Sequence, residues 1–268
     1  MDVLQSRPEG HTHNHGHDFG EKLYIHRHSI LHELPPQHKI VLALVFIIFG
    51  ISTPNSSLQI FIGYGALMLG VIFLAKLPVL KIVKRSVIEV PFLIFALLMP
   101  LAGSGDFTTF LGIKFYHEGI VAGGAIILKG TLGVFIALVL SATTKAREII
   151  DGLEKLKLPT LMVQISIFML RYINVVSDEM DRMKIARESR GFFATGIKHW
   201  KVIGQAASAL FIRSYERGER VHLAMISRGY TGLLPQAKSR SLMKNERFAI
   251  FSFISLLILI KSYEVFFL

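Results

Sequence analysis

The sequence predicts an all-α integral membrane protein with about five transmembrane helices and a cytoplasmic domain of two long helices. Two observations carry this prediction. Hydrophobic residues make up 51% of the 268 residues and the mean hydropathy is +0.49, which is too high for an ordinary soluble domain. The basic residues behind the net charge of +11 gather outside the apolar stretches, as in the cytoplasmic loops of membrane proteins. This distribution explains the charge without nucleic acid, which we do not expect as a partner.

Polarity divides the chain into four segments. They are a polar, His-rich N-terminal segment (1–38), four transmembrane helices (39–143), a long charged region with two helices (144–246) and a last transmembrane helix (247–268). We expect no signal peptide, because the first segment has no apolar core. The chain has no cysteine, so disulfide and thiolate chemistry are excluded.

The first apolar stretch, residues 39–75, is interrupted only by a polar turn at 53–57. A single helix of this length would be ~55 Å long, well beyond a bilayer core of ~30 Å. We therefore expect a hairpin of two spans. Residues 89–104 form a third span and residues 119–143 a fourth, whose glycines favour close helix packing.

The positive-inside rule gives one consistent topology. The loop 75–85 carries four Lys/Arg, and region 144–246 carries 18 Lys/Arg against 10 Asp/Glu, so both are expected in the cytoplasm with the N-terminus. Five spans then place the C-terminus outside. An apolar run at 158–170 leaves an alternative, because it could also insert. It is short and runs directly into Arg171, so a helix at the membrane interface is favoured.

Region 144–246 contains a repeated segment. Residues 182–192 read RMKIARESRGF and residues 220–230 read RVHLAMISRGY, with five of eleven positions identical at an offset of 38 residues. Apolar spacing predicts one helix from Pro159 to a stop at Gly191, and a second helix is expected from Trp200 to a stop at Gly229.

An arginine in the last turn of such a helix faces the negative end of the helix dipole and can present a planar head to an acidic groove. Two such ends suggest a device that docks to partner proteins. The candidate partner-binding residues are Ser189, Arg190, Gly191, Ser227, Arg228 and Gly229.

These residues resemble the paired Ala-Arg-Gly-like motifs of the EcfT family, the transmembrane coupling subunits of energy-coupling factor (ECF) transporters. Serine stands at Ser189 and Ser227 where alanine is common in the family. The stretches KLP at 76–78, LSATT at 140–144 and LKLP at 156–159 are similar to the family as well. Among its members the chain looks most like CbiQ of cobalt uptake systems.

The resemblance implies a scaffold of the inner (plasma) membrane, without cofactor or active site, that serves cobalt uptake for cobalamin biosynthesis. Two copies of a CbiO-like ABC ATPase would each offer a groove to one coupling helix, with Arg190 and Arg228 in the grooves. The membrane helices would pass ATP-driven motion to a CbiM-like substrate-binding subunit, with a small accessory membrane subunit as a further partner. The chain has no GxxxxGK[ST] loop, so we do not expect it to hydrolyse ATP itself.

Nickel or vitamin uptake through the same machinery is an alternative, and a stand-alone metal cation channel is an alternative of another class. The channel would be supported by Lys129, within the fourth span, and by the tract of His11, His13, His15 and His17. That tract either binds a divalent metal weakly or is a disordered polar tail. For Lys129 we expect a structural ion pair, with Glu89 or Glu118 as the partner.

Overall fold

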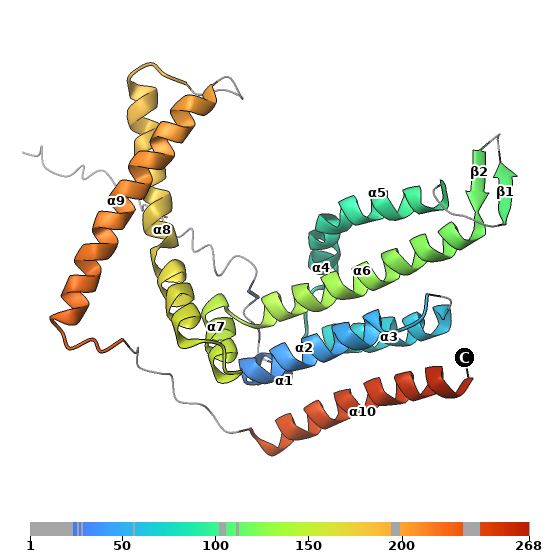
Figure 1. Cartoon of the computed structure of the whole chain (residues 1–268). Helices are drawn as coiled ribbons and strands as arrows, with labels where there is room; N and C mark the ends of the chain where they lie inside the picture. Colours follow the sequence, from blue (N-terminus) through green and yellow to red (C-terminus); the bar gives the residue numbers. More distant parts are fainter. Residues whose placement is uncertain are drawn as a thin grey trace, which may run out of the picture.

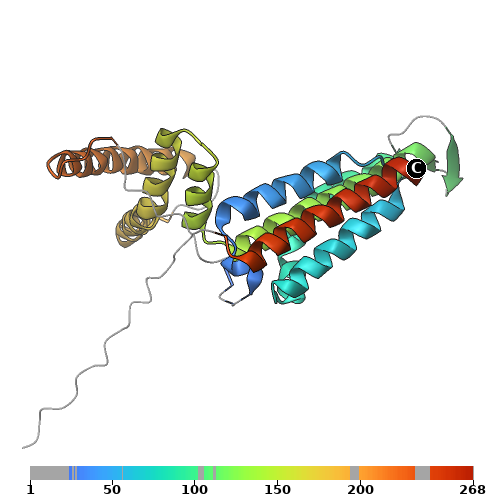
Figure 2. The ribbon, with the colours of Figure 1, turned by 90° about the horizontal axis from the view of Figure 1, so that it is seen from below.

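The computed structural model describes residues 24, 25, 27, 29–55, 57–101, 106–110, 113–193, 199–232 and 242–267. Its helices form a bundle and an arm that lies beyond one end of the bundle (Figures 1 and 2). The membrane bundle consists of α2 (Pro36–Ile51), α3 (Leu58–Leu74), α5 (Val90–Leu98), α6 (His117–Thr143) and α10 (Lys244–Phe267). The arm consists of α8 (Thr160–Ser189) and α9 (Trp200–Ile226). The all-α membrane fold is thereby confirmed.

Shorter elements connect these helices. They are α1 (Ile30–Glu33) before the bundle, α4 (Val79–Arg85) and a 3₁₀ turn (Ser86–Glu89) before α5, a second 3₁₀ turn (Met99–Leu101) after α5, and α7 (Ala146–Lys155) between the bundle and the arm. The loop before α6 carries a hairpin of β1 (Phe107–Phe110) and β2 (Ile113–Tyr116), which pairs Phe107 with Tyr116. Where two helices were expected in region 144–246, the described residues therefore contain three.

Three described helices are long and apolar enough to cross a membrane, namely α6, α8 and α10. The apolar helices α2 and α3 are shorter. In α8 only the first half is apolar, and only 6% of its most apolar 18-residue window is buried. Figure 1 shows α8 running across the direction of the bundle helices rather than alongside them.

The core of the bundle lies where α2, α3, α6 and α10 meet. Phe46 of α2, Tyr64 of α3 and Leu257 of α10 are at most 1% exposed. The rings of Phe46 and Tyr64 pack edge to face with their centroids 5.8 Å apart. On the outside of the same helices large apolar side chains are exposed, among them Phe73 and Phe251, as a bilayer requires.

Glycines bring α6 against α5 and the 3₁₀ turn that follows it, as the composition of the fourth span predicts. A methyl group added at Gly119 would lie 2.5 Å from the carbonyl oxygen of Met99, and one added at Gly123 would lie 2.6 Å from that of Ala96. Both distances are below any normal contact, so only glycine lets the two backbones approach this closely.

The expected ion pair of Lys129 with a carboxylate is wrong. Its ammonium group donates to the carbonyl oxygen of Ile51 at 3.3 Å and to Oδ1 of Asn55 at 2.9 Å. Glu89 is buried and instead accepts a hydrogen bond from Thr131 at 2.7 Å. The physical reason is that the last carbonyls of α2 have no partner within their helix, so a lysine from α6 supplies the donor.

A second lysine binds the same turn from α10. Lys261 donates to the carbonyl oxygen of Ser52 at 3.1 Å and to Glu264 at 2.5 Å. The buried carboxylate of Glu264 also accepts from the hydroxyl of Thr53 at 3.1 Å. The turn between α2 and α3 is therefore held by α6 and α10 together.

Candidate functional site: two matched helix ends

The first helix end, residues 189–191, closes α8 with a Schellman motif. Gly191 has a φ of +78°. Its N–H donates to the carbonyl oxygen of Glu188 at 2.9 Å, and the N–H of Phe192 donates to that of Arg187 at 3.2 Å. These are the two bonds by which a left-handed residue satisfies the last carbonyls of a helix. The predicted glycine stop at this position is correct.

The second helix end, residues 227–229, closes α9 with the same motif. Gly229 has a φ of +82°. Its N–H donates to the carbonyl oxygen of Ile226 at 2.9 Å, and the N–H of Tyr230 donates to that of Met225 at 3.0 Å. The sequence repeat therefore encodes a structural repeat, because each hydrogen bond of the first end has its counterpart in the second.

The two serines behave alike. The hydroxyl of Ser189 donates to the carbonyl oxygen of Ile185 at 2.9 Å, and that of Ser227 donates to the carbonyl oxygen of Leu223 at 3.0 Å. Each hydroxyl proton is thus bonded within its own helix. A partner protein would meet little more than a small side chain at either position.

Arg190 and Arg228 are exposed at these helix ends. Within the described part of the chain, neither guanidinium group has a hydrogen-bond or ion-pair partner. A methyl group added at Gly191 or Gly229 would meet nothing within 4 Å, so glycine serves the backbone conformation there and not close packing. Each end therefore presents an exposed, planar cation on a fixed backbone.

The surroundings of the two ends differ. At the first end, the ring of Phe192 packs edge to face on His199, with centroids 5.2 Å apart. Phe193 is 64% exposed. The first end therefore lies at the tip of the arm, where α8 passes over to α9 (Figure 1).

The second end is bonded to the start of α8. The hydroxyl of Tyr230 donates to Oε1 of Gln164 at 2.9 Å, and Nε2 of Gln164 donates to the carbonyl oxygen of Gly232 at 2.6 Å. Gln164 is buried. Sequence analysis missed this residue, although a side-chain amide in the apolar run at 158–170 is a signal that could have found it.

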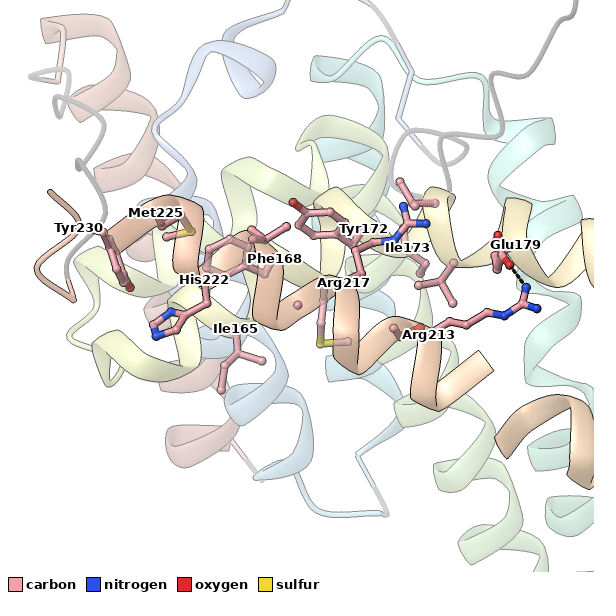
Figure 3. Close-up of a pocket in the computed structure, with 16 residues that line it drawn as sticks. Ile165, Phe168, Tyr172, Ile173, Glu179, Arg213, Arg217, His222, Met225 and Tyr230 are labelled. Carbon is pink, nitrogen blue, oxygen red and sulfur yellow. Dashed lines mark hydrogen bonds and ion pairs between the residues drawn. The ribbon is translucent and has the colours of Figure 1, made fainter. Parts of the chain in front are cut away.

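An apolar groove of about 640 Å³ runs between α8 and α9. Figure 3 shows Tyr230 at one end of it, apolar side chains such as Phe168 and Ile165 along it, and Glu179 with Arg213 at the other end. Glu179 and Arg213 form an ion pair that links the two helices. Along the groove α8 and α9 are apart, and polar contacts join them at its two ends. One contact is the ion pair of Glu179 with Arg213, and the other is formed by the second helix end.

Metal-ligating residues do not gather in the described residues, where no group of three or more His, Cys, Asp or Glu is placed to hold a metal ion. The predicted tract of His11, His13, His15 and His17 lies outside the described residues. The groups that the two helix ends expose are the guanidinium groups of Arg190 and Arg228.

Known proteins provide a comparison. The family described as "CbiQ: Cobalt transport protein" matches residues 27–240. The energy-coupling factor transporter transmembrane protein EcfT of Thermanaerovibrio acidaminovorans is 31% identical over 82% of this chain and 86% of its own length. EcfT of Bacillus subtilis is 30% identical over 82% of this chain and 88% of its own length.

A third relative is longer. The putative fused cobalt transport protein CbiMQ of Methanocorpusculum labreanum is 29% identical over 85% of this chain but only 40% of its own length. The relatives that carry these names are transporter membrane proteins and not enzymes. The chain belongs to the CbiQ family and is a membrane-embedded T component of an energy-coupling factor transporter.

Proposed function

We propose that each helix end binds one copy of an ABC-type ATPase subunit, similar to CbiO. The observation that carries this proposal is the match between the ends, which share a Schellman motif, an inward-bonded serine and an exposed arginine. Two equal ends suit two equal partners. Arg190 and Arg228 would each enter an acidic groove, where a guanidinium group forms planar, bidentate hydrogen bonds.

The ATPase subunits would lie in the cytoplasm, so the arm and the N-terminus lie there and the C-terminus lies outside. The positive-inside rule supports this orientation, since 18 Lys/Arg fall in region 144–246. The exposed apolar side chains early in α8, such as Leu161 and Met169, would lie at the membrane interface. Closure of the ATPase pair would then move α8 and α9 relative to each other.

The substrate that we propose is cobalt, taken up for cobalamin biosynthesis through a separate CbiM-like substrate-binding membrane subunit, with a small accessory membrane subunit as a further partner. The description of the family names cobalt transport. The name of the fused relative joins CbiM to CbiQ, and this chain covers 40% of that protein. Both support a transporter in which this chain works beside a CbiM-like protein.

The docking proposal is tested by co-purification with the ATPase subunits. We expect Arg190→Ala with Arg228→Ala to lose bound ATPase, with each substitution costing about tenfold or more in affinity. The matched control is Arg182→Ala with Arg220→Ala, which removes equal charge from the corresponding positions of the repeat. Those two arginines have only weakly paired, exposed side chains. Retained ATPase binding in the first double variant would show that the ends are not the docking sites.

The substrate is tested with the complete transporter in proteoliposomes. We expect ATP-dependent uptake of radioactive cobalt, and competition by nickel weaker than competition by unlabelled cobalt. The chain alone should carry neither ion. Uptake by the chain alone would establish a stand-alone channel. Stronger competition by nickel or by a vitamin would show that this compound, and not cobalt, is the substrate.

A further inference from the structure

The helix α7 is the link between the membrane bundle and the arm. Only Thr144 and Lys145 separate it from α6, and only residues 156–159 separate it from α8. Both connections are too short to absorb a large movement of α8. Any displacement of α8 must therefore reach α7. The contacts of α7 then determine which other helix is displaced.

The connection from α7 to α8 is stiff. Lys157 has a φ of +67°, its N–H donates to the carbonyl oxygen of Glu154 at 2.9 Å, and the N–H of Leu158 donates to that of Leu153 at 3.2 Å. This is again a Schellman motif, here with lysine in place of glycine. Pro159 follows and restricts Leu158. Neither residue offers the backbone freedom of a glycine hinge.

The connection from α6 to α7 is tied to α2. Lys39 of α2 is buried, and its ammonium group donates to the carbonyl oxygen of Thr143 at 2.9 Å and to that of His32 at 3.0 Å. The last turn of α6 is thus fixed to the first turns of α2. Movement of α7 relative to α6 is for this reason also movement relative to α2.

Gly152 brings the backbone of α7 against the first turn of α2. A methyl group added at Gly152 would lie 2.9 Å from Cδ1 of Ile40, 3.0 Å from the backbone nitrogen of Gln37 and 3.1 Å from the carbonyl carbon of Pro36. Two of these three atoms belong to the backbone, so a change of rotamer would not relieve the crowding. The short helix α7 therefore rests on α2 through a residue at which even a methyl group would crowd the α2 backbone.

We propose that this contact between Gly152 and the first turn of α2 is the point at which movement of the arm passes into the membrane bundle. The proposal rests on the function proposed above. Gly152 is a positioning residue, which acts by fixing α7 to α2. A side chain there would separate α7 from α2 and leave both helix ends intact.

The experiment measures cobalt ions transported per ATP hydrolysed by the complete transporter in proteoliposomes. We expect Gly152→Ala to bind the ATPase subunits normally and to lower this ratio about tenfold. Loss of folded protein alone would lower transport and hydrolysis together and leave the ratio unchanged. The matched control is Gly65→Ala in α3, where an added methyl group would meet nothing within 4 Å and the ratio should stay as in the wild type.

A second variant keeps the test decisive if Gly152→Ala does not accumulate. Ile40→Val removes Cδ1, the atom nearest to the added methyl group. The pair Gly152→Ala with Ile40→Val should therefore fold better and still transport fewer ions per ATP than Ile40→Val alone, since the backbone contacts stay crowded. Normal ratios in both Gly152→Ala variants, with ATPase subunits bound, would overturn this proposal and leave the docking proposal standing. Failure of the wild type to bind the ATPase subunits would instead refute the docking proposal.

Discussion

The first helix end, at the tip of the arm, and the second helix end, after α9, have the same backbone but different neighbours. Both end in a left-handed glycine with the same two hydrogen bonds. Among the described residues, only the second end is hydrogen-bonded to another helix, through Gln164. Local sequence therefore sets the shape of each end, whereas contacts distant in sequence set how freely each end can move.

This difference gives the two proposed docking sites separate roles in transmission. The second end is fixed to the start of α8, which follows α7 directly. The first end lies at the other end of α8, which is ~45 Å long. Force applied at the second end thus has the shorter path to the α2–α7 contact.

The largest effect is expected when the shared backbone is broken. Gly191→Val and Gly229→Val each place a β-branched residue at a φ near +80°, which costs about 1–2 kcal/mol. We expect each to lower affinity for the ATPase subunit about tenfold at its own end. Affinity is measured by calorimetric titration in a variant whose other end carries Arg→Ala.

The control for this prediction is asparagine, which tolerates the left-handed conformation. Gly191→Asn and Gly229→Asn should bind nearly as the parent does. Equal binding by the valine and asparagine variants would show that the ordered helix end contributes nothing to docking. Unequal losses in the two valine variants would show that the ends are not equivalent.

A smaller effect, confined to one end, is expected from Gln164→Leu. This change removes the bonds to Tyr230 and Gly232, each worth about 1 kcal/mol at most once water replaces the partner. We expect affinity for the ATPase subunit to fall about threefold at the second end and to stay unchanged at the first end. Amide hydrogen exchange at Tyr230 should become faster. Ser166→Ala is the control, because that exposed hydroxyl bonds only within α8. An equal loss at both ends would contradict the separate roles.

The smallest effect is expected from Ser189→Ala and Ser227→Ala. Because both hydroxyl groups donate to their own helix, their removal should change affinity less than about twofold. Thermal unfolding should show stability unchanged or raised by about 0.5 kcal/mol, since alanine is the better helix former. A tenfold loss of affinity would mean that the partner reads the serine hydroxyl directly.

Much of the fold could be predicted because its signals are local. The polar turn at 53–57 ends one apolar stretch and begins the next, and α2 and α3 meet there. Gly191 and Gly229 end their helices as the repeat predicts. The helix α7 was not predicted, although its apolar residues Ile149, Ile150 and Leu153 alternate with charged residues at a helical spacing.

The sequence by itself determined the membrane class, the order of the long helices and the two matched ends, because hydrophobicity, helix stops and repeats are properties of neighbouring residues. Only the tertiary structure decided which groups meet. Lys129 lies 78 residues from the carbonyl that it binds, and Gln164 lies 66 residues from Tyr230. Each buried polar group takes the donor or acceptor that packing supplies, and that choice is made by the arrangement of the helices in space.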